Sequence, residues 1–380
     1  MRIDYAESRQ STLGVEWEIA LVDRESGDLR SVAQEILDGV HANHGNLGPD
    51  DEHPHVKQEL LLNTVEIVTG VCDTVAQAKK ELHDNMQAVR EIADPMGVEL
   101  FSAGSHPIAQ PSTQPVTDKD RYGKLIDRTQ WWGRQMVIYG VHVHVGVDHK
   151  SKVLPIVDGL INFQPHLQAL SASSPYWGGE DTGYASQRAL MFQQLPTAGL
   201  PYHFSQWSEY ESYVADMLHT GVIDDISEIR WDVRPVPRFG TVEMRIADGL
   251  SSLKDVGAMA ALTQCLVQSM SDRLDAGERI PVMPPWYRVE NKWRAARYGL
   301  DAIIILDKAG NEMLVTDHLT EVLNELEPIA KRLDCENELR DVERIMRGGA
   351  GYQWQRKIAA ENDGDLRALV RDNTARMRLT

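Results

Sequence analysis

The sequence predicts a mixed α+β protein whose short strands carry polar side chains on one face and apolar side chains on the other. Three segments support this prediction, because polar and apolar residues alternate in each: 12–22, 141–146 and 241–248. Successive side chains of a strand point to opposite faces of its sheet, so each segment gathers its polar members on one face. Helix-like apolar spacing in 74–96 and 256–274 indicates the helical part of the fold.

Composition limits the classes of partner. The 380 residues include 39 Lys and Arg against 57 Asp and Glu, a net charge of -18, which opposes attraction to nucleic acid and to anionic membranes. No apolar run approaches the ~20 residues of a membrane span, and the three cysteines lack metal-site spacing. We therefore expect a cytoplasmic protein that acts on small molecules, without nucleic-acid or membrane partners.

The length and the absence of linkers bear on domain organisation. No repeat, low-complexity segment or obvious linker divides the 380 residues. We expect a single catalytic domain over residues 1–380, with a mostly helical C-terminal portion from about residue 300. A homodimer is compatible with the sequence but is not indicated by any motif.

The first strand, 12–22, places two carboxylates on one face. Glu16 and Glu18 are two residues apart, and such carboxylates repel each other. On an interior face they would require cations, whereas on a solvated face they are ordinary. Taken by itself, the sequence of this strand favours an arrangement in which Glu16 and Glu18 face solvent.

The next strand-like runs, 56–61 and 63–69, form two strands or one bent strand. Glu59 and Glu66 lie in them among apolar neighbours, where an unpaired charge is costly. The runs thus add two candidate interior carboxylates. A helix over 74–96 follows, with Thr74 as its N-cap.

The segment 140–146 reads Gly-Val-His-Val-His-Val-Gly. Its valines occupy one face, while His142 and His144 share the other. Alone, this pattern is typical of a hydrogen-bonded histidine pair on a half-exposed strand. We expect a helix over 154–170, interrupted near Pro165, and an irregular loop over 171–183.

Arginines gather in an otherwise acidic chain at Arg230, Arg234 and Arg238, and Arg188 precedes them. Clustered arginines hold carboxylates or phosphates bidentately, but they also pair with surface acids, and both interpretations stay open. The strand over 241–248 follows, with its apolar residues on one face and Glu243 beside Arg245 on the other. It repeats the pattern of the two earlier strands.

The polar strand faces together carry many carboxylates, few histidines and no thiolate. Such a donor set favours Mg²⁺ or Mn²⁺ over structural zinc, and Mg²⁺ sites are usually completed by substrate phosphates. The residues therefore suggest phosphoryl chemistry on a metal-lined sheet. The common phosphate loops, kinase signatures and HExxH are absent, so a nucleotide is not held by one of those motifs.

Four ordered motifs are similar to those of glutamate-cysteine ligase family 2, the bacterial carboxylate-amine ligases. They are residues 14–18, the Glu59 and Glu66 pair, residues 140–146 and residues 241–248. The resemblance implies a fold like that of glutamine synthetase and guanidino kinases. In that fold a curved, mainly antiparallel sheet carries the site and helices pack on its outer face.

The resemblance also implies a reaction. ATP phosphorylates the side-chain carboxylate of glutamate, and the amine of cysteine or a related amine attacks the acyl phosphate, giving γ-glutamylcysteine or a related γ-glutamyl amide. Positions that bind Mg²⁺ in the family match Glu16, Glu18, Glu59, Glu66 and Glu243. His142 matches a histidine that contacts metal or phosphate, and Arg245 an arginine near the transferred phosphoryl group. We take Glu243 and Arg245 as the catalytic pair.

The motifs do not decide which residues bind the remaining substrate groups. The candidates for substrate or phosphate binding are Arg188, Arg230, Arg234, Arg238 and His144. Two other functions remain open: a zinc hydrolase that uses the His-x-His strand, and a catalytically silent relative that binds amino acids.

Overall fold

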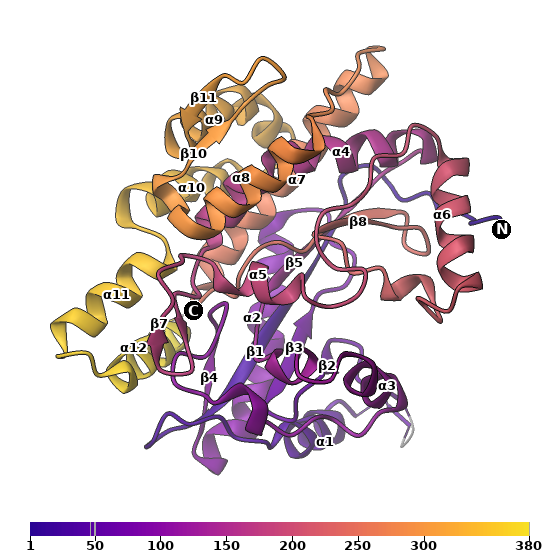
Figure 1. The fold of residues 1–380 in the computed structure, drawn as a ribbon. Coiled ribbons are helices and arrows are strands. Elements are labelled where there is room, and N and C mark those ends of the chain that lie inside the picture. The colour runs from indigo at the N-terminus through magenta and orange to yellow at the C-terminus, as the bar shows by residue number, and fades with distance from the viewer. Residues whose placement is uncertain (46, 49–50, 380) are drawn as a thin grey trace.

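The computed structural model describes residues 1–45, 47–48 and 51–379. Its centre is a seven-stranded sheet in the order β2-β3-β1-β5-β9-β8, with β4 pairing to β1 beside this path (Figure 1). Every pairing in this sheet is antiparallel, which confirms the predicted class. The strands are β1 (Leu13–Asp23), β2 (Val56–Gln58), β3 (Thr64–Val68), β4 (Val98–Phe101), β5 (Val141–Gly146), β8 (Val233–Val236) and β9 (Thr241–Met244).

Helices occupy much of the remaining chain. Their bounds are α1 (Ala33–Asn43), α2 (Val75–Ala93), α3 (Asp120–Thr129), α4 (Lys150–Ser171), α5 (Gln187–Phe192), α6 (Trp207–His219), α7 (Leu253–Asp275), α8 (Pro285–Tyr298), α9 (Val315–Arg332), α10 (Glu336–Gly348), α11 (Gly351–Glu361) and α12 (Leu366–Arg378). The predicted start of α2 is confirmed, because the Thr74 hydroxyl accepts the backbone N–H of Gln77 at 3.2 Å.

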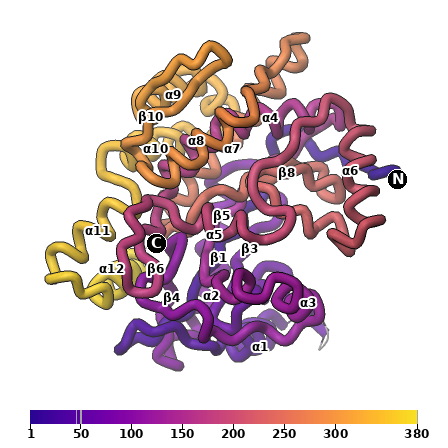
Figure 2. The backbone as a smooth tube through the Cα atoms, viewed as in Figure 1, coloured from indigo at the N-terminus to yellow at the C-terminus, as the bar shows by residue number. Residues whose placement is uncertain are grey.

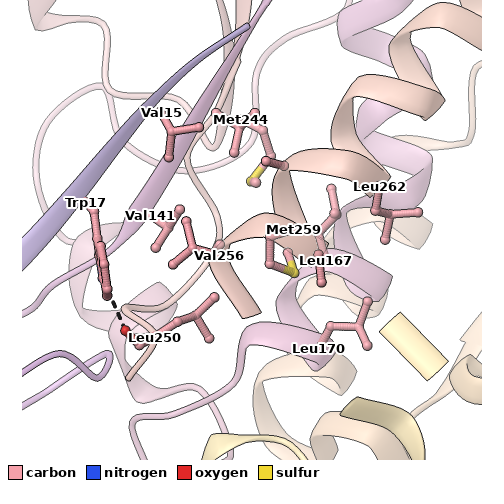
Figure 3. Close-up of a cluster of buried hydrophobic side chains, with 14 of the residues drawn as sticks. Val15, Trp17, Val141, Leu167, Leu170, Met244, Leu250, Val256, Met259 and Leu262 are labelled. Carbon is pink, nitrogen blue, oxygen red and sulfur yellow. Dashed lines mark hydrogen bonds between the residues drawn. The ribbon is translucent and has the colours of Figure 1, made fainter. Parts of the chain in front are cut away.

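The apolar face of the sheet packs against helices, which leaves the polar face for the site. Val15, Trp17 and Val141 of β1 and β5 belong to one buried cluster with Met259 of α7 (Figure 3). The indole N–H of Trp17 donates to the carbonyl of Leu250 at 3.1 Å, so its one polar atom is satisfied inside the core. Helices α2 and α4 also contact strands of the sheet.

The C-terminal helices pack around the core that the sheet and its covering helices form. Helices α9 and α10 pack on α7, while α12 packs against β4 and α11 (Figure 2). This region also contains a hairpin that the sequence did not predict, β10 (Ile303–Ile305) with β11 (Glu312–Leu314). In the part of the chain that the structure describes, no helix combines the length and apolarity that a membrane crossing requires.

The expected interruption near Pro165 is wrong. Helix α4 runs unbroken from Lys150 to Ser171 and contains Pro155 as well. Proline inside a helix costs about 3 kcal/mol through its lost hydrogen bond and ring clash. Most residues of α4 are buried, so tertiary packing offsets this cost. The expected loop over 171–183 begins on the last residue of α4 and otherwise contains the two-residue strands β6 (Tyr176–Trp177) and β7 (Glu180–Asp181).

Candidate functional site

Strand register aligns the predicted polar residues across the sheet. Glu18 of β1 lies opposite Glu66 of β3, and Glu16 of β1 lies opposite His142 of β5. Directly paired residues of antiparallel strands point to the same face. The face that carries Glu16 and Glu18 is therefore part of a site, although their strand alone favoured a solvated surface.

The alignment continues on the other side of β5. His144 lies opposite Glu243 of β9, and Glu243 lies opposite Arg234 of β8. The polar side chains thus form one row across five strands. We call the following residues the carboxylate band: Glu16, Glu18, Glu59, Glu66, His142, His144 and Glu243.

Glu16 lies between the two histidines. Its oxygens are 3.0 Å from His142 Nδ1 and 3.2 Å from His144 Nε2, and His144 Nδ1 is 3.1 Å from the Thr241 hydroxyl. Burial raises the pKa of Glu16, but the hydrogen bonds from the two imidazoles outweigh burial and hold the pKa well below its usual value. Glu16 is therefore ionised in this arrangement.

The two histidines differ in how readily they take up a proton. Burial and the nearby Arg245 lower the pKa of His142 to about 4, so its imidazole is neutral at pH 7. Burial also disfavours protonation of His144, but Glu243 and Glu16 outweigh it and raise the pKa of that imidazole. A neutral His142 that donates through Nδ1 to Glu16 keeps Nε2 as an acceptor.

Glu243 is fully buried between two arginines. Arg234 Nε donates to one of its oxygens at 2.6 Å, and Arg245 forms an ion pair with the other. Burial alone would raise the pKa of Glu243, but the two guanidinium groups hold it well below the usual range. The negative charge of Glu243 in turn raises the pKa of Arg245 against the effect of burial.

The opposite end of the band has carboxylates without such partners. Burial and the neighbouring Glu59 raise the pKa of Glu18 to about 7, although the Gly140 N–H donates to Glu18 at 2.5 Å. Burial raises the pKa of Glu59 and, more strongly, that of Glu66. Within the described ranges none of the three forms an ion pair, so a bound cation would favour the ionised forms that burial disfavours.

The donor atoms suit a hard divalent cation. Three groups each place their ligand atoms within 4.8 Å of one another: Glu16, Glu66 and His142; Glu16, His144 and Glu243; Glu18, Glu59 and Glu66. Each group has at least two carboxylates and at most one imidazole. Oxygen-dominated donor sets of this kind fit Mg²⁺ or Mn²⁺ better than zinc.

A cavity of about 1110 Å³ opens in front of the band, and Glu16, Glu59, Glu66 and His144 line it. Basic residues that the sequence analysis did not single out line the same cavity: Lys57, Lys119 and Arg121. Lys57 is two residues from Glu59 and lies opposite Glu66 in the register of β2 and β3. The period of the strand could therefore have placed Lys57 on the same face as these carboxylates. Arg121 belongs to α3, a helix that carried no motif.

The predicted arginines occupy different places. Arg188 of α5 is buried, with Nη2 3.5 Å from His142 Nε2 and Nη1 donating to the carbonyl of Arg245 at 3.2 Å. Arg238 lines the cavity. Arg230 instead donates to the carbonyl of Glu228 at 2.9 Å. The structure thus brings Arg188, Arg234, Arg238 and Arg245 to the site and places Arg230 beside it.

A sequence profile described as glutamate-cysteine ligase family 2 (GCS2) matches residues 12–372. The chain belongs to this family. A relative from Arthrobacter sp. (strain FB24), provisionally named glutamate--cysteine ligase 2-1, is 71% identical over 378 residues, covering 100% of this chain and 99% of that protein. A relative from Mycobacterium tuberculosis (strain ATCC 25618 / H37Rv), provisionally named glutamate--cysteine ligase 2, is 57% identical over 369 residues, covering 97% and 96%.

Solved structures show the same fold at low sequence identity. A glutamate--cysteine ligase from Francisella tularensis in complex with AMP matches with a TM-score of 0.64 and 14% identity, covering 99% of this chain and 95% of that one. A bifunctional glutathione synthetase from Pasteurella multocida matches with a TM-score of 0.67 and 14% identity, covering 97% and 52%. Membership of glutamate-cysteine ligase family 2 makes the chain a ligase that forms carbon–nitrogen bonds.

Proposed function

We propose that the chain is an ATP-dependent carboxylate-amine ligase that joins the γ-carboxylate of glutamate to an amine. The product is γ-glutamylcysteine or a related γ-glutamyl amide. The observation that carries this proposal is the carboxylate band in front of a cavity of about 1110 Å³. Three carboxylates of the band, Glu18, Glu59 and Glu66, form no ion pair among the described residues and are suited to a metal ion that carries phosphates, and the adjacent arginines are suited to the anions of the substrates.

Glu18, Glu59 and Glu66 would hold Mg²⁺ or Mn²⁺ at one end of the band, and Glu16, His142 and Glu243 would hold it along the rest. The bound ion neutralises charge on the phosphates of ATP and on the oxygens in transfer. The raised pKa of Glu18 and Glu66 is consistent with this assignment, because a bound cation would favour the ionised forms that burial disfavours.

The reaction has two steps. A carboxylate oxygen of glutamate attacks the γ-phosphorus, the bond from that phosphorus to the β–γ bridging oxygen breaks, and ADP departs. The amine nitrogen then attacks the acyl carbon, phosphate leaves with the electron pair of its C–O bond, and the nitrogen loses a proton. No residue of the chain forms a covalent bond in either step.

The arginines position these groups. Arg245 is fixed by Glu243, so its guanidinium is preorganised beside the band and can bind the phosphoryl oxygens as charge redistributes. Arg188 is fixed by two backbone carbonyls and lies on His142, where it can bind an anionic oxygen of a substrate. Alignment of both substrates in one cavity removes up to ~7 to 11 kcal/mol of entropic barrier.

An amine screen tests the proposal. The purified protein is incubated with ATP, Mg²⁺, glutamate and single amines, cysteine among them, while ADP, phosphate and the amide are measured. We expect stoichiometric ADP and amide with at least one amine. Glutamate labelled with ¹⁸O in its γ-carboxylate should transfer one label to the released phosphate, as an acyl phosphate requires.

The same screen separates the alternatives. A zinc hydrolase would cleave γ-glutamyl amides without ATP, and it would depend on zinc. The donor atoms do not favour it, because each candidate metal-binding group has at least two carboxylates and at most one imidazole. A silent relative would bind amino acids but consume no ATP with any amine, which would refute the ligase proposal.

A further inference from the structure

An aromatic side chain is exposed inside the cavity that faces the carboxylate band. Phe239 lies between β8 and β9, at the tip of their hairpin, and 48% of it is exposed. Among the described residues that line the cavity it is the only Phe, Tyr or Trp. Because this exposed ring lines a cavity, it offers a planar apolar surface to a ligand that enters the cavity.

The backbone at Phe239 is held in place from both sides. The Ser8 hydroxyl donates to the Phe239 carbonyl at 2.6 Å, and the Phe239 N–H donates to the Val236 carbonyl at 3.1 Å. The next residue, Gly240, has a φ of +65°, and a Cβ there would overlap the Ala6 carbonyl. The N-terminal segment therefore packs directly on the hairpin tip, and the ring is presented from a fixed position.

The surroundings of the ring connect it to the band. The guanidinium carbon of Arg238 lies 4.3 Å from the centre of the Phe239 ring. The His144 ring approaches Phe239 edge-on, with centroids 6.1 Å apart, and His144 also contacts Glu16 of the band. An aromatic surface with a cation thus adjoins one end of the row of metal-binding candidates.

We propose that Phe239, backed by Arg238, is the stacking platform for the purine base of the nucleotide. This inference rests on the proposed function, in which the band binds the phosphates of ATP. The base of a nucleotide so placed needs a planar apolar surface within one nucleotide length of the band, and Phe239 supplies it. Arg238, which the sequence suggested for substrate or phosphate binding, then acts by packing on the ring.

Binding measurements with and without a base test the platform. Isothermal titration of the full chain with Mg²⁺-ADP and with Mg²⁺-tripolyphosphate compares wild type with Phe239→Ala, Phe239→Leu and Phe239→Trp. We expect Phe239→Ala to weaken ADP roughly 5- to 100-fold and to leave tripolyphosphate unchanged, because stacking on a side chain contributes only to base binding. Phe239→Trp should keep wild-type ADP affinity, whereas Phe239→Leu, which keeps an apolar side chain, should weaken it.

Trp286→Ala is the matched control, because Trp286 is 63% exposed on α8 and does not line the cavity. It should bind both ligands as wild type does. Unchanged ADP affinity in Phe239→Ala, or equal loss of ADP and tripolyphosphate, would overturn the platform. Either result leaves the ligase proposal standing, whereas a wild-type protein that consumes no ATP in the amine screen refutes that proposal even if ADP binds at Phe239.

Discussion

At the scale of single residues, the carboxylate band has two electrostatic halves. Glu16 and Glu243 already have cationic or hydrogen-bonding partners within the chain, and both have a lowered pKa. Glu18, Glu59 and Glu66 have no ion-pair partner in the described residues, and their pKa values are raised. Similar side chains on one sheet face therefore differ in how readily they ionise, and a bound cation would act mainly on the second half.

Glu243→Gln should abolish turnover and leave the fold intact. Glutamine has the same shape but no charge, so Arg234 and Arg245 lose their shared counter-ion and Arg245 loses its fixed position. Loss of one preorganised electrostatic contact costs about 100-fold or more in kcat. ADP release measures the effect, with circular dichroism for the fold.

Glu290→Gln is the control for that variant. Glu290 pairs with Arg294 on α8 at 2.8 Å, and exposed pairs of this kind contribute about 0–1 kcal/mol. It should keep wild-type turnover. Wild-type activity in Glu243→Gln would remove Glu243 from the site assignment.

The stability gained from Mg²⁺ should depend on pH. The folded-state pKa of Glu18, about 7, lies above its ordinary value of 4.5, so between these pH values the folded state holds more protons than the unfolded state. The free energy of unfolding of the metal-free protein therefore falls by about 3 kcal/mol from this group as the pH rises from 4.5 to 7. Mg²⁺ competes with the proton and should offset that loss.

Thermal unfolding with and without Mg²⁺ measures this effect. The rise in Tm on adding Mg²⁺ should be larger at pH 8 than at pH 5, because the carboxyl is protonated at the lower pH. Glu18→Gln, which cannot ionise, should show a smaller difference between the two conditions. An equal Tm rise at both pH values in the wild type would contradict the assignment of Glu18.

At the scale of elements, alternation predicted the strands that carry the site. The segments around Glu16, His142 and Glu243 are β1, β5 and β9, and their polar residues share one face as expected. Alternation within one strand cannot tell a buried polar face from a solvated one, because that depends on which strands lie alongside. Helix α5, which carries Arg188, was missed because its six residues are too few for a helical period to show.

Strand β5 begins beside a glycine that the site requires. A Cβ at Gly140 would overlap Arg188 Nη2 and approach the Ala247 carbonyl at 3.1 Å, while the Gly140 N–H donates to Glu18. Gly140→Ala should therefore displace the Arg188 guanidinium. A shift of about 1 Å at such a group can cost up to about 100-fold in rate.

Gly123→Ala on α3 is the comparison, because a Cβ there meets nothing within 4 Å. Steady-state kinetics and Tm are measured for both variants. We expect kcat to fall for Gly140→Ala but not for Gly123→Ala. The Tm of Gly123→Ala should rise slightly, because alanine favours the helical conformation more than glycine does. Equal kinetics in the two variants would show that Arg188 does not need its present position.

At the scale of the whole molecule, the cavity is assembled from segments far apart in the sequence. Leu37 of α1, Arg121 of α3 and Phe239 between β8 and β9 line one space, yet their own segments gave no sign of this. The sequence could thus predict the strands and the residues of the band, but of the remaining cavity lining only Arg238. The single catalytic domain, the cytoplasmic location and the homodimer stay predictions.

The burial of all three cysteines bears on the mechanism. Burial and the nearby Glu81 raise the pKa of Cys72 to about 12, and contact with Cys335 together with burial raises that of Cys265. Cys265 and Cys335 place their sulfurs 3.6 Å apart in the interior. The thiolate is the nucleophilic form, so Cys72 and Cys265 are not suited to carry an acyl group, and Cys335 is buried away from substrates.

Alkylation tests this conclusion. Iodoacetamide applied to the native protein should leave turnover unchanged, and mass spectrometry should find Cys72, Cys265 and Cys335 unmodified. The same treatment in guanidinium chloride should label all three. Rapid modification of one native cysteine together with loss of turnover would instead point to a thioester on the protein. Preserved turnover is the result that an acyl phosphate predicts, because that intermediate requires phosphates and cations at the carboxylate band but no protein nucleophile.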